Sequence, residues 1–296
     1  MAKIKLEIFP TDRTCGAEIR GVDLSQDLDD ATFEAIQQAI GAHDVIFFRD
    51  QDVPPHQLVK FSKRFGPIER HVRQEFALDG YPEIHVLSNI KDTEGKGIGS
   101  AYAGDMWHTD QCFKKKPNWL SILHAIEIPM KDGVALGDTM FCSTAHAYET
   151  LDDETKEKIN DIRSIMQYNR RQEMKRQQAL QADYKRPPLT EEQKRATPDI
   201  TQPVVRTHNV TGRKAIYVNE TYTFGIEGMD DAEAQPLLRR LQDHCLTEDN
   251  IYRHSWRKGD VVIWDNITTQ HKAIGDYALP LRRKMHRTTV EGFEVI

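Results

Sequence analysis

Five side chains in this sequence have the types and the order needed to hold a metal ion and an organic anion. His108 and Asp110 lie two residues apart, and a second histidine, His271, follows far downstream. Two imidazoles and one carboxylate form a donor set that leaves one face of an iron(II) ion open to other ligands. Arg283 and Arg287 supply fixed positive charge for an anionic co-substrate or substrate. The combination indicates an oxygenase rather than a hydrolase.

The first two residues of this set can act together. In an extended segment, residues two apart point the same way, so His108 and Asp110 can reach one metal from one strand end. Neutral imidazole and ionised carboxylate, the forms that bind a metal, are both available near pH 7. A His-x-Asp tripeptide arises often by chance, however, and the chain has 12 histidines. The flanking motifs must therefore show whether His108 and Asp110 are metal ligands.

Composition is typical of one large globular domain. The chain has 296 residues, of which 39% are hydrophobic and 29% charged. All-β barrels often reach this size undivided, so we expect a single domain over residues 1–296. No apolar run is long enough for a membrane span, which would need about 18 residues. The net charge of −6 argues against a nucleic-acid partner.

The N-terminus and the cysteines favour a cytoplasmic protein. Residues 1–7 show no long apolar core and no cleavage site of small residues, so we expect no secretory signal. The cysteines are scattered and form no CxxC pair, which indicates reduced thiols rather than a disulfide framework or a zinc site. They are Cys15, Cys112, Cys142 and Cys245.

Short strand-like segments recur along the chain between a few helices. Apolar or alternating segments lie at 3–9, 45–48, 84–87, 119–128, 137–142, 215–218, 260–264 and 285–290. Helices are expected from Asp29 or Asp30, from Pro54-Pro55 to Gly66-Pro67, from Ser143 or Thr144, from Asp152 or Asp153, and over 230–245. Many strands and no βαβ rhythm predict an α+β protein, mainly β with flanking helices. Its core is expected to be a double-stranded β-helix of the jelly-roll, cupin-like type.

Residues 167–202 differ from their surroundings because they are polar, basic and rich in glutamine. We interpret them as an insertion between core strands. A solvated helix and loop is the favoured form, and a functional lid over the site is the alternative.

Four ordered motifs give the chain a specific resemblance. They are Trp107-His108-Thr109-Asp110, Gly137-Asp138-Thr139, Trp264-Asp265-Asn266…Gln270-His271 and Arg283…Met285-His286-Arg287. Together they resemble the taurine dioxygenase family, which also includes alkylsulfatase-type and aryloxyalkanoate dioxygenases. The similarity runs from Gly21-Val22-Asp23-Leu24 and Phe65-Gly66-Pro67 to Thr288-Thr289-Val290.

The resemblance implies the following roles. His108, Asp110 and His271 would hold iron(II), with 2-oxoglutarate and dioxygen as co-substrates. Arg283, helped by Thr139, would pair with the distal carboxylate of 2-oxoglutarate, a charge that must be neutralised in a partly buried pocket. The neighbouring Arg282 should point to the opposite face of a strand, which would make it a surface charge.

The resemblance also assigns the anchor of the substrate. Arg287 would bind an anionic group of the substrate, and His71 would assist it, with Arg70 and Arg73 as competitors for that role. Gly104 falls where the taurine enzyme carries an amine-binding asparagine, which counts against taurine itself. Tyr102 and Asp105 are alternative pocket residues.

These features predict an iron(II)- and 2-oxoglutarate-dependent dioxygenase that hydroxylates a small anionic molecule and releases succinate and carbon dioxide. Sulfonates, sulfate esters, aryloxyalkanoates and other carboxylates all fit, and a C–S or C–O bond would break where the hydroxylated carbon bears the heteroatom. A homo-oligomer, dimer or tetramer, is expected from related enzymes. The alternatives are a non-catalytic cupin-like anion-binding protein and a metal-dependent hydrolase on a β-barrel.

Overall fold

The structure is a computed structural model that describes residues 6–71, 74–101, 104–181 and 188–295. Its largest element is a sheet of eight strands, which are antiparallel to their neighbours except for the parallel pair β2–β3. In spatial order the strands are β1 (Glu7–Pro10), β2 (Ala17–Arg20), β3 (Val45–Phe48), β16 (Val261–Asp265), β6 (Leu120–Glu127), β18 (Lys284–Thr289), β5 (Tyr81–Ser88) and β4 (Ala77–Leu78).

A second, smaller sheet has the order β15 (Ile251–His254), β9 (Thr139–Ser143) and β17 (Thr269–Ala273). One buried cluster combines side chains of the large sheet, such as Leu123 and Trp264, with Phe141 of the small sheet. The two sheets are therefore joined through a common apolar core. Together with the likeness to known structures given below, this arrangement confirms the predicted jelly-roll class.

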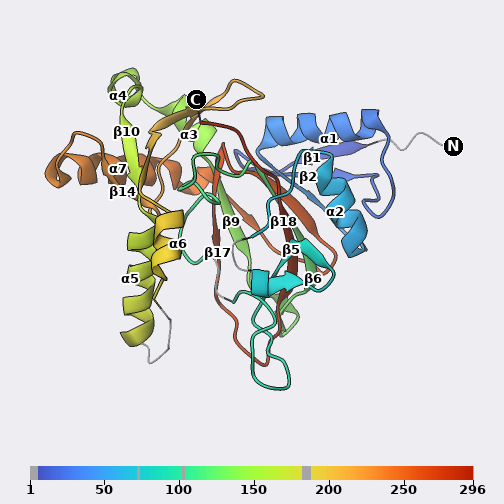
Figure 1. The fold of residues 1–296 in the computed structure, drawn as a ribbon. Coiled ribbons are helices and arrows are strands. Elements are labelled where there is room, and N and C mark those ends of the chain that lie inside the picture. The colour runs from blue at the N-terminus through green and yellow to red at the C-terminus, as the bar shows by residue number, and fades with distance from the viewer. Residues whose placement is uncertain (1–5, 72–73, 102–103, 182–187, 296) are drawn as a thin grey trace.

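The outer face of the large sheet is covered by two helices, α1 (Asp30–His43) and α2 (Pro55–Lys63) (Figure 1). In strand β3, Ile46 and Phe48 belong to the cluster under these helices, whereas Val45 and Phe47 belong to the cluster between the sheets. Successive strand residues face opposite sides, so a strand covered on both faces is a continuous apolar run. Of the two predicted caps of α1, Asp29 and Asp30, the structure has Asp29, whose side chain accepts from the backbone N–H of Thr32.

The opposite side of the molecule packs around the small sheet. Helix α7 (Asp231–Cys245) contributes Leu237 and Leu241 to a third cluster, which also contains Cys142 of β9. The other elements here are α3 (Thr144–Thr150), α4 (Asp153–Ile159), β12 (Val205–Thr207) and β13 (Lys214–Ile216). The remaining short elements are β7 (Met130–Lys131), β8 (Val134–Ala135), η1 (Gln74–Phe76) and η2 (Glu248–Asn250).

The polar insertion forms helix α5 (Tyr168–Gln181), helix α6 (Glu191–Ala196) and strand β11 (Ile200–Pro203). The two helices lie side by side at one edge of the molecule (Figure 1), where Asn169 donates to the backbone oxygens of Lys194 and Thr197. Strand β11 pairs with β10 (Arg163–Met166), which also pairs with β14 (Thr223–Ile226). The insertion is therefore tied into a small sheet of its own.

Several predicted boundaries differ from the structure, and two of them matter for packing. The first strand begins at Glu7, and residues 3–5 of the predicted segment 3–9 lie outside the described residues. Helix α2 ends at Lys63, so Phe65 packs from the segment after it. Among the described residues, no helix combines the length and apolarity needed to cross a membrane.

Candidate active site

The two histidines of the candidate metal site lie directly opposite each other. His108 forms an isolated antiparallel bridge with His271 of β17, in which each backbone N–H donates to the other residue's oxygen at 3.1 and 2.8 Å. Their ring centroids are 4.2 Å apart. His108 and Asp110 reach one cluster from the end of this bridge, as predicted, and the extended segment is short because the chain turns at Asp110 and Gln111 has a φ of 54°.

Asp110 completes the cluster. Its Oδ1 lies 3.7 Å from Nε2 of His108 and 4.0 Å from Nε2 of His271. One donor atom from each of the three residues lies within 4.8 Å of the others. Nδ1 of His108 is 2.8 Å from the backbone oxygen of Met106, which leaves Nε2 of His108 to face the cluster. Residues 163 positions apart thus converge as potential ligands of one metal ion.

The protonation states suit a metal. Burial lowers the pKa of His108, and it lowers that of His271 to about 3, so both imidazoles are neutral at pH 7. Burial alone would raise the pKa of Asp110, but Arg287 and the two histidines lower it well below its usual range. The cluster is therefore ready to bind a cation without releasing protons.

Asn266 positions the ligand segment from the end of β16. Its Oδ1 accepts hydrogen bonds from the backbone N–H of Asp110 at 3.2 Å and from Nε1 of Trp264 at 3.0 Å. Its Nδ2 donates to Oγ of Ser121, which in turn donates to Oδ2 of Asp110 at 2.7 Å. The Trp264-Asp265-Asn266 motif thus orients the carboxylate through side chains that do not themselves face the cluster.

Arg283 and its neighbour Arg282 lie in different surroundings. Arg283 is 7% exposed, its Nε has no hydrogen-bond partner, and no ion pair to it is found in the described part of the chain. Burial lowers its pKa, while contact with Tyr277 acts in the other direction. Arg282 is half exposed and forms an ion pair with Glu127 at 3.1 Å.

Arg283 borders a small cavity of about 60 Å³. The other lining residues are Leu87, Ser88, Ser100, Ala101, Asp105, Ala273, Ile274, Gly275 and Tyr277. Thr139 does not line it but is connected to Arg283 through Trp256. The indole N–H of Trp256 donates to Oγ1 of Thr139 at 3.1 Å, and the guanidinium of Arg283 lies 6.0 Å from the Trp256 ring. A buried cation beside a cavity can neutralise a carboxylate.

Arg287 lies directly beside the metal cluster. Its Nη1 is 3.5 Å from Oδ1 of Asp110, and its Nε has no hydrogen-bond partner. Its strand partner on β5 is His85, and the ring centroids of His85 and His71 are 3.9 Å apart. His71 is therefore separated from Arg287 by one histidine that sequence reasoning left without a role.

The remaining predicted pocket residues lie on the loop before His108. Gly104 has a φ of 80°, and a Cβ there would lie 3.1 Å from Cε1 of His108. Asp105 lines the cavity beside Arg283 and pairs with two cations of α5, Arg171 and Lys175, at 3.6 and 3.2 Å. Two of the predicted candidates, Tyr102 and Arg73, lie outside the described residues.

Comparison with known proteins assigns this geometry to a family. The model of the taurine catabolism dioxygenase TauD, TfdA family matches residues 7–289. The chain belongs to this family. It is an iron(II)- and 2-oxoglutarate-dependent dioxygenase, which confirms the predicted enzyme class and cofactors and rules out the non-catalytic and hydrolase alternatives.

Relatives of the dioxygenase include an alpha-ketoglutarate-dependent sulfate ester dioxygenase of Pseudomonas putida, which is 33% identical over 98% of this chain and 90% of that protein. The alpha-ketoglutarate-dependent 2,4-dichlorophenoxyacetate dioxygenase of Cupriavidus pinatubonensis is 28% identical over 92% and 93%. A taurine dioxygenase structure from Burkholderia xenovorans matches with a TM-score of 0.79 at 28% identity, covering 98% of this chain and 91% of that one. The structure of AAD-2 in complex with Mn(II) and N-oxalylglycine has the same TM-score at 27% identity, covering 98% and 99%.

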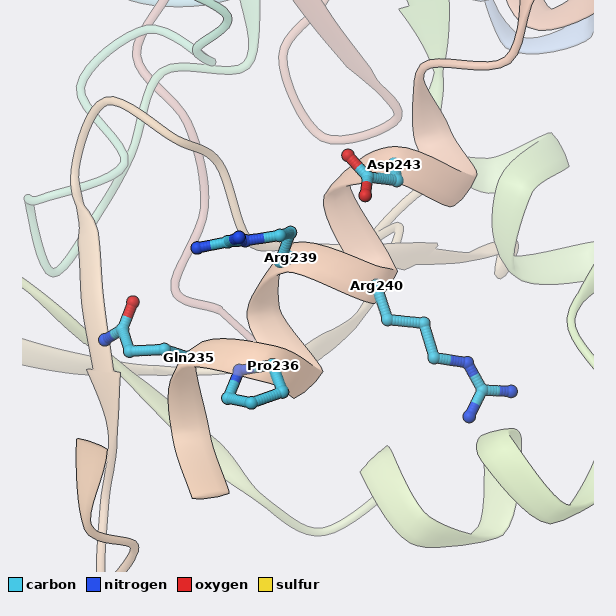
Figure 2. A pocket seen from close by; sticks show the side chains of 5 residues that line it. All are labelled: Gln235, Pro236, Arg239, Arg240 and Asp243. Carbon is cyan, nitrogen blue, oxygen red and sulfur yellow. The ribbon is translucent and has the colours of Figure 1, made fainter. Parts of the chain in front are cut away.

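A wider depression of about 490 Å³ lies on the surface of α7 in the dioxygenase (Figure 2). It is lined by Gln235, Pro236, Arg239, Arg240 and Asp243. Figure 2 shows Arg239 and Arg240 directed away from each other, and Arg240 pairs with Asp152 at 3.0 Å. None of these residues belongs to the metal cluster or lines the cavity beside Arg283, so this depression is separate from the candidate site.

Two supporting residues were missed by sequence reasoning. Asn266 was part of a quoted motif, so its position signalled importance although its role did not follow. Ser121 stands in an ordinary apolar strand and gave no signal. Cys112 is fully buried and burial raises the pKa of its thiol to about 12, which suits the reduced thiol expected for it.

Proposed function

We propose that His108, Asp110 and His271 hold the iron(II) ion of this dioxygenase. The observation that carries the proposal is the convergence of three donor atoms within 4.8 Å of one another, with both imidazoles neutral and the carboxylate ionised. Two imidazoles and one carboxylate fit iron(II) and leave sites for further ligands. The bond of Met106 to Nδ1 of His108 presents the other nitrogen to the metal.

We propose Arg283 as the anchor of 2-oxoglutarate, with Thr139 nearby in support. A dicarboxylate bound at the metal through one end must have its other carboxylate neutralised, because the pocket is largely shielded from water. Arg283 offers an unpaired Nε next to a cavity, whereas the charge of Arg282 is already paired with Glu127. This difference supports Arg283 over its neighbour.

We propose Arg287 as the anchor of a small anionic substrate, with His71 as a neighbour in the same pocket. An anion held by Arg287 lies next to the metal ligands, since the guanidinium is 3.5 Å from Asp110. Relatives named for sulfate esters and for 2,4-dichlorophenoxyacetate have substrates with one anionic group and a heteroatom-bearing carbon. A sulfate ester, sulfonate, aryloxyalkanoate or other carboxylate is therefore the proposed substrate class.

When bound, iron(II) and 2-oxoglutarate supply the oxidising power, through decarboxylation of the co-substrate to succinate coupled to hydroxylation of the substrate. The chain contributes positioning and charge. Arg283 and Arg287 fix the two organic anions, Asn266 and Ser121 hold the carboxylate of Asp110, and the buried surroundings exclude water. Where the hydroxylated carbon bears sulfur or oxygen, the product would break down with cleavage of that bond.

The test is succinate release by the purified protein with iron(II), 2-oxoglutarate and oxygen, in the presence of sulfate esters, sulfonates, aryloxyalkanoates and carboxylates. We expect succinate, stimulated by at least one of these anions. Chelation of the metal and His108→Ala should each abolish it, because the ligand set is then incomplete. His146→Ala, on the surface of α3, is the matched control and should retain activity. Succinate release that survives in His108→Ala would contradict the proposed ligand set.

Three broader predictions accompany this function. We propose that residues 1–296 act as one catalytic domain, with α5 and α6 of the insertion beside the site. A reducing cytoplasm suits the four cysteines, which are all free and buried. A dimer or tetramer stays a prediction that size-exclusion chromatography with light scattering can test.

A further inference from the structure

Helix α5 of the insertion turns a cationic face toward the loop that carries the metal ligands. Tyr168, Arg171 and Lys175 are spaced by three and four residues, so they lie on one face of the helix. Arg171 is 1% exposed although it belongs to a strongly polar helix. Arg176, next along the chain, is instead paired with Glu173 on the outer surface. The buried position of Arg171 therefore requires a separate explanation.

The guanidinium of Arg171 is incompletely satisfied. Its Nε and Nη2 have no hydrogen-bond partner, and the nearest carboxylate, Asp105, lies 3.6 Å from Nη2, which is too long for a hydrogen bond. The same oxygen of Asp105 also accepts from Lys175 at 3.2 Å. One carboxylate thus faces two cations, and no other ion pair to Arg171 is found within the described ranges. Burying a guanidinium whose N–H groups lack acceptors costs free energy unless a ligand accepts those hydrogen bonds.

Several contacts connect this face to the reaction site. Asp105 lines the same cavity as Arg283, three residues before His108. Tyr168 packs against Phe113 with ring centroids 4.4 Å apart, and Phe113 comes three residues after Asp110.

Electrostatic interactions also connect the side chains of α5 to the residues around the metal cluster. The ammonium of Lys175 is close enough to act on the imidazole of His108. The carboxylate of Asp110 and the guanidinium of Arg171 both interact electrostatically with the phenol of Tyr222. Together with the contacts of Asp105 and Phe113, these interactions place the cationic face of α5 beside the segment that carries His108 and Asp110.

We propose that Arg171, supported by Lys175, binds a second anionic group of the substrate, so that the preferred substrate carries negative charge at both ends. The inference rests on the proposed function, in which Arg287 holds the first end beside the metal. Asp105 serves as the internal counter-ion when the second anion is absent, and its more than half-exposed side chain can turn toward water when the anion binds. The rings of Phe113, Tyr168 and Tyr222 provide an apolar wall for the middle of such a molecule.

The test compares matched probes that differ by one terminal carboxylate. Hexyl sulfate is paired with 6-sulfooxyhexanoate, hexanesulfonate with 6-sulfohexanoate, and phenoxyacetate with 4-carboxyphenoxyacetate. Calorimetry without oxygen, on protein loaded with iron(II) and 2-oxoglutarate, measures their dissociation constants. In at least one pair, the dissociation constant of the dianion should be about tenfold or more below that of its partner. The reason is that a hydrogen bond to a charged group contributes about 1.5–3 kcal/mol. Arg171→Met should remove that preference and leave the affinity for the monoanion within about twofold.

Matched variants separate charge from packing. Arg176→Met, on the same helix but at the surface, should keep the preference intact. Lys175→Met, at a less buried position, should reduce it and provides a second reading if Arg171→Met fails to fold. The inference is overturned if no pair shows the preference, or if the preference survives in Arg171→Met and Lys175→Met. Failure of the proposed function would show separately, as a wild-type protein that releases no succinate.

Discussion

At the scale of single residues, the site depends on side chains that hold the proposed ligands as much as on the ligands themselves. Asn266 serves three neighbours: it accepts from Asp110 and Trp264 and donates to Ser121. The carboxylate of Asp110 is thereby fixed before a metal arrives. Such supporting groups commonly change metal affinity about 10- to 100-fold when they are removed.

We expect Asn266→Ala to weaken iron(II) binding by about 10- to 100-fold. It should also lower the free energy of unfolding by about 1–3 kcal/mol, because buried donors lose their partner. Asn250→Ala is the control, because Asn250 is also buried. Its side chain donates to the backbone oxygens of Ser143 and Cys245 and makes no hydrogen bond to a residue of the metal cluster among those found in the described residues. It should cost stability but leave the affinity for iron(II) unchanged. Equal losses of affinity in the two variants would contradict the role of Asn266.

The paired arginines offer a second test at this scale. Arg283→Met should raise the KM for 2-oxoglutarate by about tenfold to a hundredfold, because charge-assisted hydrogen bonds of about 1.5–3 kcal/mol are lost. Arg282→Met removes only a half-exposed ion pair with Glu127 and should leave the KM nearly unchanged. Steady-state succinate formation measures both. The opposite ranking would reassign the anchor to Arg282.

At the scale of elements, the turn before β9 positions the proposed co-substrate pocket. Gly137 has a φ of 78°, and a Cβ there would meet the ring of Tyr277 at 2.8 Å and Nε of Arg283 at 3.2 Å. Its N–H donates to Asp276 at 2.7 Å, which ties the turn to the segment after β17. Glycine is therefore required both by the backbone conformation and by the space that the arginine occupies.

Gly137→Ala should displace Arg283 or Tyr277 and raise the KM for 2-oxoglutarate about tenfold, in addition to a backbone cost of about 1–2 kcal/mol. Gly133→Ala, in the neighbouring β7–β8 turn, has nearly the same φ of 80° but open space around its Cβ. It should carry the backbone cost alone, visible as a lower midpoint of thermal unfolding with an unchanged KM. A similar KM in both variants would argue against the crowding at position 137.

At the scale of the whole molecule, burial of imidazoles couples folding to pH. In the described part of the chain, burial lowers the pKa of several histidines, among them His43, His108, His124, His254, His271 and His286. Between the lowered pKa in the folded state and the ordinary value near 6.5, the unfolded chain binds more protons than the folded chain. The free energy of unfolding must therefore fall as the pH is lowered below about 6.5.

His286 gives this coupling a local test, because burial lowers its pKa to about 4. In the metal-free protein, His286→Gln should flatten the decline of stability between pH 6.5 and 4 by up to one proton, or about 1.4 kcal/mol per pH unit. Urea unfolding across this range measures the slope. His56→Gln, an exposed residue of α2, should leave the slope unchanged. A slope that His286→Gln does not alter would show that this imidazole is not held neutral by the fold.

The strand-rich class, the starts of α1, α3 and α4, and the three residues of the metal cluster could all be predicted from the sequence. These features follow from local periodicity, from capping side chains and from motifs with fixed spacing, none of which needs long-range contacts. The parallel pairing of β2 with β3 and the bridge between His108 and His271 could be known only from the folded chain. Both depend on which distant segments of the chain pack together, and the local periodicity of the sequence does not specify this packing.

The insertion shows the same division. Its composition correctly predicted a polar helix, but a helix that is polar on every side does not reveal which face is covered. Only packing against Phe113 and the loop of Asp105 buried Arg171 and left its guanidinium short of partners. Burial depends on neighbouring elements, so the difference between the buried Arg171 and the partly exposed Arg176 became visible only in the folded chain.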